Sequence, residues 1–71
     1  MQRWEYAILT LYHGGGLSFN GEPLPERSQP DHQLKWIGLD GWELVAVENP
    51  SYAPVNKIVQ VMWYFKRPLK G

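Results

Sequence analysis

The chain has 71 residues and no cysteine, and its seven basic side chains balance seven acidic ones. This length allows one domain with a small core, and the lack of cysteine excludes disulfides and thiolate zinc sites. A net charge of zero removes the electrostatic argument for binding to nucleic acids or to anionic membranes. No apolar run approaches the ~20 residues that span a bilayer, and no apolar signal-peptide core opens the chain. We therefore expect a soluble cytoplasmic protein that associates with no membrane.

The first predicted element is a strand over residues 3–12, a run of aromatic and aliphatic residues without Gly or Pro. Its two faces separate by alternation into Trp4, Tyr6, Ile8, Thr10 and Tyr12 on one side and Arg3, Glu5, Ala7, Leu9 and Leu11 on the other. Charges mark only the start of the second face. We therefore expect this strand to be partly buried on both sides.

Residues 13–28 are predicted to form a long connection that begins with Gly14-Gly15-Gly16. Asn20-Gly21 is a strong signal for a two-residue hairpin turn, which could fold residues 17–19 onto residues 22–24 as a small flap. Pro23 would keep the second arm at an edge. The segment is therefore predicted to be either a long loop or a short hairpin flap.

A helix is predicted over residues 29–37. Ser28 is the expected N-cap, with Asp31 reaching back in a capping-box arrangement. Leu34 and Ile37 share one face, and Gly38 is the expected left-handed residue after the last turn. A helix this short is not stable alone, so we expect it to pack on a sheet.

Two further strands are predicted over residues 42–48 and 56–67. The last strand is apolar on both faces along most of its length, so we place it centrally and antiparallel to both others. The predicted fold is α+β in the order β-α-β-β: a single domain over residues 1–71, with a three-stranded, mainly antiparallel sheet and one helix on one face. The other face would stay open, which predicts a homo-oligomer, most simply a two-fold dimer.

Three motifs carry a resemblance to a known family. They are Trp4-Glu5-Tyr6, the central Gly38-Leu-Asp-Gly41-Trp42-Glu43-Leu44-Val45, and the closing Phe65-Lys66-Arg67-Pro68. Together they are similar to the small bacterial and phage proteins of domain-of-unknown-function family 4177. The chain departs from that pattern in residues 13–28 and at Ile37, where the family more often has Leu. The family has no established activity, so the resemblance implies a fold and no site.

Four sets of residues are candidate sites. Gly14–Gly16 lacks the helix, lysine and hydroxyl of a phosphate loop, so we expect a flexible hinge there. His13 and His32, with Asp31 or Glu22, have no ligand spacing, so no metal or cofactor is predicted. Paired carboxylates can act as acid and base, but Glu5, Glu43 and Glu48 are expected to be structural, Glu43 by pairing with Lys66 or Arg67. No catalytic residue is predicted.

The fourth set is an aromatic one. Trp4, Tyr6, Trp63, Tyr64 and Phe65 could stack single-stranded bases, with cations from Arg3, Lys57, Lys66 and Arg67. Neutral overall charge makes nucleic acid the weaker alternative. An enzyme with an inter-subunit pocket is a second alternative.

The leading prediction is a non-catalytic oligomeric module that acts by protein association or by small-ligand binding between subunits. Its partner is a second copy of itself. The predicted interface or core residues are Trp4, Tyr6, Val59, Val61, Trp63 and Phe65, and the predicted structural turn is Gly38, Gly41 and Trp42.

Overall fold

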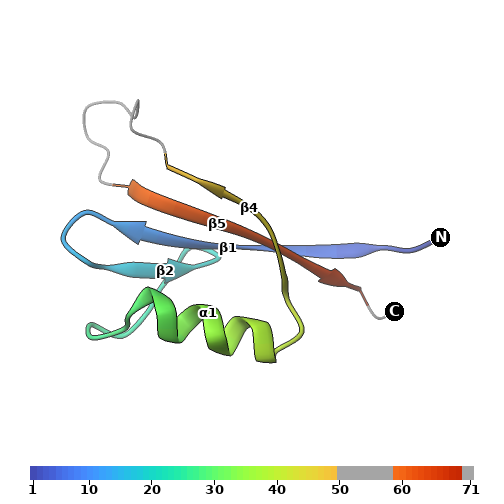
Figure 1. Ribbon diagram of the computed structural model, residues 1–71, viewed down its shortest axis with the longest axis horizontal. Coiled ribbons are helices and arrows are strands. Elements are labelled where there is room, and N and C mark those ends of the chain that lie inside the picture. The colour runs from blue at the N-terminus through green and yellow to red at the C-terminus, as the bar shows by residue number, and fades with distance from the viewer. Residues whose placement is uncertain (50–58, 70–71) are drawn as a thin grey trace.

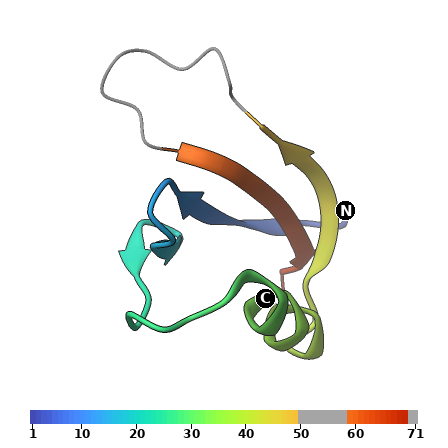
Figure 2. The ribbon, with the colours of Figure 1, turned by 60° about the vertical axis from the view of Figure 1, so that its left-hand side comes forward.

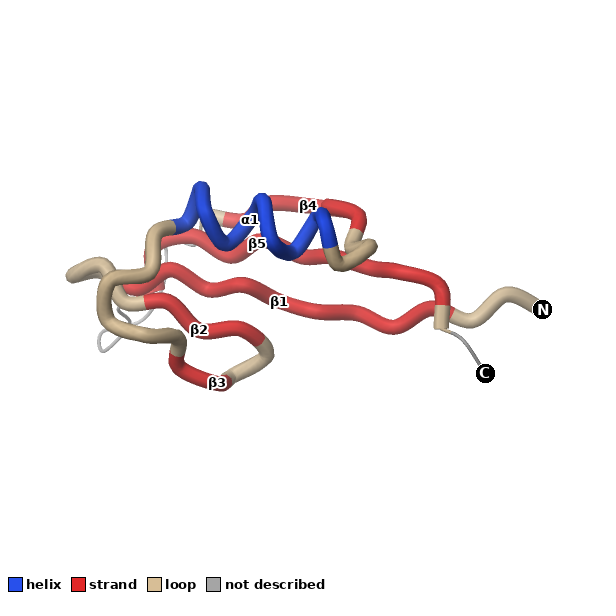
Figure 3. Tube along the Cα trace, turned by 90° about the horizontal axis from the view of Figure 1, so that it is seen from below, coloured by secondary structure: helices blue, strands red, loops and turns tan. Residues whose placement is uncertain are grey.

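The structure is a computed structural model that describes residues 1–49 and 59–69 (Figure 1). Its elements in chain order are β1 (Trp4–Tyr12), β2 (Leu17–Phe19), β3 (Glu22–Pro23), α1 (Pro30–Leu39), β4 (Glu43–Glu48) and β5 (Val59–Pro68). The strands form one antiparallel sheet in the order β3-β2-β1-β5-β4. The sheet curves around α1, as Figure 2 shows. Seen from the helix side in Figure 3, α1 crosses in front of its β4–β5 half.

The prediction of a three-stranded sheet is wrong, although the class is α+β. The difference comes from the segment expected to be a loop or a separate flap. Asn20 and Gly21 have φ of 52° and 85°, and the chain reverses there between β2 and β3. β2 pairs with β1, with Thr10 opposite Ser18. The hairpin therefore belongs to the main sheet and adds two strands.

The Asn20 side chain explains why this hairpin joins β1. Its Oδ1 accepts a hydrogen bond from the Ile8 N–H at 2.9 Å, and the Asn20 N–H donates to the Ile8 carbonyl at 2.8 Å. At the other end, the triple glycine makes the β1–β2 turn, where the Gly15 N–H donates to the Tyr12 carbonyl at 3.0 Å. Both ends of β2 are thereby fixed to β1.

β5 lies between β1 and β4 and runs antiparallel to both, as its two apolar faces predict. The predicted start of this strand, residues 56–58, lies outside the described residues. With β5 and β4 on one side and β2 and β3 on the other, β1 is the middle strand of five.

The core lies between α1 and one side of the sheet, which we call the helix face. Its buried apolar residues are Ala7, Leu9, Leu17, Ile37 and Phe65, and the half-buried residues around them include Leu34, Trp42 and Trp63. The opposite side, the open face, carries Trp4, Tyr6, Ile8, Thr10 and Tyr12 from β1 by alternation, and Tyr64 and Lys66 from β5 by register.

α1 begins one residue later than expected. Its N-cap is Gln29, with φ of −121° and ψ of 143°, and no side chain caps it. The capping box predicted at Ser28 is therefore wrong. The cause is Pro30, the first helical residue, because proline confines the residue before it to extended backbone conformations.

The helix ends at Leu39 in a Schellman arrangement. The Gly41 N–H donates to the Gly38 carbonyl at 3.0 Å, and the Trp42 N–H donates to the Ile37 carbonyl at 3.2 Å. Gly41 has φ of 89°, so it is the left-handed residue. The prediction of that role for Gly38 is wrong, because Gly38 lies inside the helix.

Alanine substitutions at Gly38 and at Gly41 should change the free energy of unfolding in opposite directions. A Cβ at Gly38 meets nothing within 4 Å, so Gly38→Ala should raise the free energy of unfolding by about 0.5–1 kcal/mol through helix propensity. Gly41→Ala should lower it by about 1 kcal/mol, because the left-handed conformation strains a residue with a Cβ. Urea unfolding of both variants at one protein concentration measures this; a destabilised Gly38→Ala would contradict it.

Candidate interaction surface

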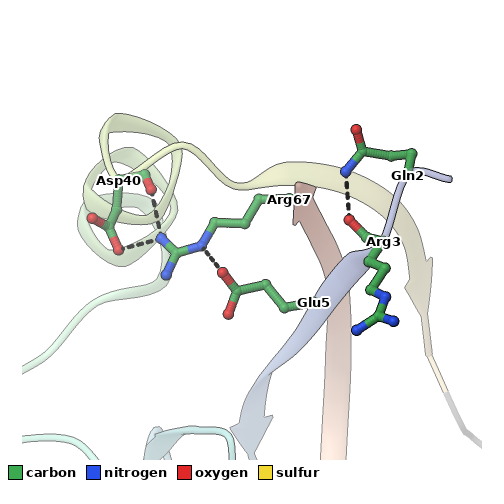
Figure 4. A network of polar contacts seen from close by, with 5 residues as sticks. All are labelled: Gln2, Arg3, Glu5, Asp40 and Arg67. Carbon is green, nitrogen blue, oxygen red and sulfur yellow. Dashed lines mark hydrogen bonds and ion pairs between the residues drawn. The ribbon is translucent and has the colours of Figure 1, made fainter. Parts of the chain in front are cut away.

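The densest polar arrangement on the described chain surrounds Arg67, near the end of β5 (Figure 4). Glu5 is the cross-strand neighbour of Arg67 on β1, and Arg67 Nε donates a hydrogen bond to Glu5 Oε2 at 2.7 Å. Arg67 Nη1 donates to the Asp40 carbonyl at 2.7 Å and to Asp40 Oδ2 at 2.9 Å. One guanidinium thus joins β5, β1 and the residue that follows α1.

The same guanidinium lies over an aromatic ring. Its central carbon is 4.1 Å from the centroid of the Trp42 ring, and Phe19 meets that ring edge-on at 6.3 Å. The hydrogen bond to Glu5, aided by Asp40, raises the pKa of Arg67 above its ordinary value, against the opposing effect of partial burial. These contacts make Arg67 a structural clamp between β5, β1 and the end of α1.

The carboxylates weighed as acid and base do not come together. Glu5 binds Arg67 on the helix face. Glu48 accepts a hydrogen bond from the Tyr64 hydroxyl at 2.7 Å, and Glu43 lies at the other end of β4, about 16 Å away along the strand. Glu43 stands opposite Lys66 in the register, whereas Arg67 pairs with Glu5 and Asp40. Within residues 1–49 and 59–69 the buried polar side chains are Thr10 and Ser18, so no carboxylate or imidazole there is buried.

The histidines lie on different elements, His13 in the β1–β2 turn and His32 on α1. No group of three potential metal ligands occurs among the described residues. The triple glycine borders a hollow of about 620 Å³ that also touches Ser18 and Arg27. No helix begins behind the glycines, since α1 starts at Pro30.

The predicted interface or core residues divide between the two faces of the sheet. Trp4 and Tyr6 lie on the open face and are exposed, whereas Phe65 is buried in the core on the helix face. Trp63 and Val61 share the helix face with Phe65. Val59 begins β5, beyond a register shift between Leu11 and Tyr12.

The aromatic residues proposed to stack on nucleic-acid bases are also divided between the two faces of the sheet. Trp4, Tyr6 and Tyr64 face one side, and Trp63 and Phe65 face the other. Of its cations, Arg67 is held by carboxylates, Lys66 Nζ lies 4.3 Å from the centroid of the Trp4 ring, and Lys57 is outside the described residues. The rings and free charges of a single platform are therefore not assembled on either face.

Exposed apolar residues also occur where sequence patterns did not predict them. α1 exposes Trp36 and Leu39, and β4 exposes Leu44, Val45 and Val47. Trp36 borders a hollow of about 460 Å³ between α1 and β2, which is also lined by Phe19 and Trp42. The alternation of β4 does not reveal this exposure, because it depends on β4 being the edge of the sheet.

Comparison with protein-family models, with curated proteins and with solved structures found no match for this chain. The resemblance to family 4177 therefore stays a prediction. In the part of the chain that the structure describes, no helix is long and apolar enough to cross a membrane.

The Arg67 clamp should depend on the shape of the side chain as well as on its charge. Arg67→Lys keeps the charge, but an ammonium cannot bridge Glu5 and Asp40 while lying flat on Trp42. We expect Arg67→Lys to lower the urea midpoint of unfolding and Arg67→Ala to lower it further. Arg3→Lys is the matched control, since the Arg3 side chain forms no ion pair within the described residues. Wild-type stability of Arg67→Lys would refute the clamp.

Proposed function

We propose that the protein is a non-catalytic module that works by self-association, most simply as a two-fold dimer. The observation that carries this proposal is its surface area. A compact monomer of 8.3 kDa exposes about 4,600 Å² by size scaling, whereas this chain exposes 5456 Å². The chain thus exposes more surface than a compact monomer of its mass would, which favours association.

Shape and composition support the same proposal. The radius of gyration is 13.0 Å, against about 11 Å for a compact domain of this length. Five apolar residues are buried, while nine large apolar residues are exposed on the described chain. Exposed apolar side chains in this number motivate the proposal of a partner surface, and a second copy is the simplest partner.

An enzyme is less favoured because no titratable side chain among the described residues is buried, and no group of three potential metal ligands occurs there. Nucleic-acid binding is less favoured because the open face carries one described cation, Lys66, beside Glu43 and Glu48. We assign the module to the cytoplasm as part of this proposal, since a chain without cysteine fits a reducing compartment.

The proposal predicts the mass in solution. Sedimentation equilibrium at tens of micromolar should give 16.6 kDa, which is twice 8.3 kDa. The thermal midpoint should rise with protein concentration, because association stabilises the folded state by mass action. A mass of 8.3 kDa across the whole concentration range would refute self-association.

A further inference from the structure

We propose that the hollow between α1 and β2 binds a small organic cation that carries a methylated ammonium group. This site goes beyond the proposed self-association and does not depend on it. The hollow measures about 460 Å³, which lies within the ~300–1,000 Å³ of pockets that hold small molecules. It is lined by Phe19, Trp36, Ile37, Leu39, Asp40 and Trp42.

The lining of this hollow combines aromatic rings with one carboxylate. The rings come from three parts of the chain: Phe19 from β2, Trp36 from α1 and Trp42 from the turn that precedes β4. Asp40, which follows α1, is the charged residue of the lining. The negative faces of aromatic rings attract cations, and a carboxylate beside the rings acts in the same direction.

Trp36 is the ring of this lining whose position the fold does not explain. Its side chain is 66% exposed on α1 and lies outside the buried core. Two other tryptophan rings each carry a cation of the chain itself. Lys66 lies over Trp4, and Arg67 lies over Trp42. The described residues place no such cation over Trp36, so its ring can take a cation from solution.

The charge beside the hollow also favours a cation. Arg67 pairs with both Glu5 and Asp40, so two carboxylates stand against one guanidinium and leave one negative charge in excess. The Asp40 side chain is 72% exposed, and Arg67 bonds to its Oδ2, which leaves the other carboxylate oxygen accessible to a ligand. The cationic Lys35 borders a neighbouring hollow together with His32.

The same lining favours methyl groups on the cation. An unmethylated ammonium carries three N–H donors, and each of them needs an acceptor. The side chains of the hollow offer the Asp40 carboxylate, which already accepts a hydrogen bond from Arg67 at 2.9 Å. Donors without acceptors cost affinity, whereas methyl groups pack against the rings of Phe19 and Trp36. The preferred ligand is therefore a quaternary ammonium compound.

Three small probes test this chemistry on the wild-type protein. Choline carries the quaternary ammonium, neohexyl alcohol has a carbon in place of the charged nitrogen, and ethanolamine lacks the methyl groups. The four tryptophans can be labelled as 5-fluorotryptophan and assigned by single Trp→Phe variants. Choline should shift the ¹⁹F resonances of Trp36 and Trp42, and should bind at least about tenfold more tightly than either other probe.

Trp4 is the internal control in this titration. It lies on the opposite face of the sheet and already carries Lys66, so its resonance should stay in place. Absence of a choline-dependent shift at Trp36 would overturn the site. Equal affinity for choline and neohexyl alcohol would overturn its selectivity for a cation, and an equal shift of Trp4 would show that choline meets any accessible indole.

Matched variants locate the site on the chain. Trp36→Leu should weaken choline binding about tenfold, and Trp36→Phe should retain most of it. Asp40→Asn keeps an oxygen that can accept from Arg67 but removes the charge, so it should weaken binding of choline and leave that of neohexyl alcohol unchanged. Asp31→Asn, the same charge change in the first turn of α1, should have no effect.

Far-UV circular dichroism checks the fold of each variant. Unchanged choline affinity in either Trp36→Leu or Asp40→Asn would overturn the site, and so would an equal loss in Asp31→Asn and Asp40→Asn. None of these outcomes depends on the mass measured by sedimentation. The cation site and the proposed self-association can therefore fail separately.

Discussion

The attachment of the helix to the sheet depends on the guanidinium of Arg67. α1 buries one side chain, Ile37, so apolar packing alone fixes the helix weakly. Arg67 adds bonds in two directions, to Glu5 on β1 and to Asp40 after α1. Its planar fork suits this task, because one group can donate along two edges while its face lies on Trp42. The charge also remains at any ordinary pH, since its partners raise an already high pKa.

The clamp and the helix end depend on each other. Gly41 takes the left-handed conformation, which turns the chain so that Trp42 reaches the core beside Ile37. The Trp42 ring then lies against the Arg67 guanidinium, and the Asp40 carbonyl accepts a hydrogen bond from the same group. The conformation of one glycine therefore sets both of its neighbours, Asp40 and Trp42, against Arg67, which lies far along the chain. This explains why a helix of ten residues keeps a defined position on the sheet.

The sequence predicts local structure, such as strands and turns, better than it predicts contacts between distant parts of the chain. The apolar patterns of β1, β4 and β5 locate the three long strands, and β5 lies between β1 and β4 as its two apolar faces predict, although β1 is the middle strand of the five. β2 and β3 are too short to show a period. The Asn20-Gly21 signal identifies their turn, but docking of the hairpin on β1 is a long-range event. Similarly, Gly38 and Gly41 are equivalent in local pattern, and only the bond from Trp42 to Ile37 decides between them. The clamp was missed because Glu5 and Arg67 are 62 residues apart and meet through a register that sequence does not reveal.

The fold also sets a limit on how much of its own surface it can cover. A five-stranded sheet has two faces, and the chain supplies one helix, which occupies the helix face. A larger core would need more apolar residues on the side of α1 that faces the sheet, where Ile37 is the buried residue. The aromatic residues of β1, Trp4, Tyr6 and Tyr12, all lie on the side that points away from α1, and no helix covers that side among the described residues. In a chain this small, the proposed second copy would supply the missing layer without adding a residue to the chain.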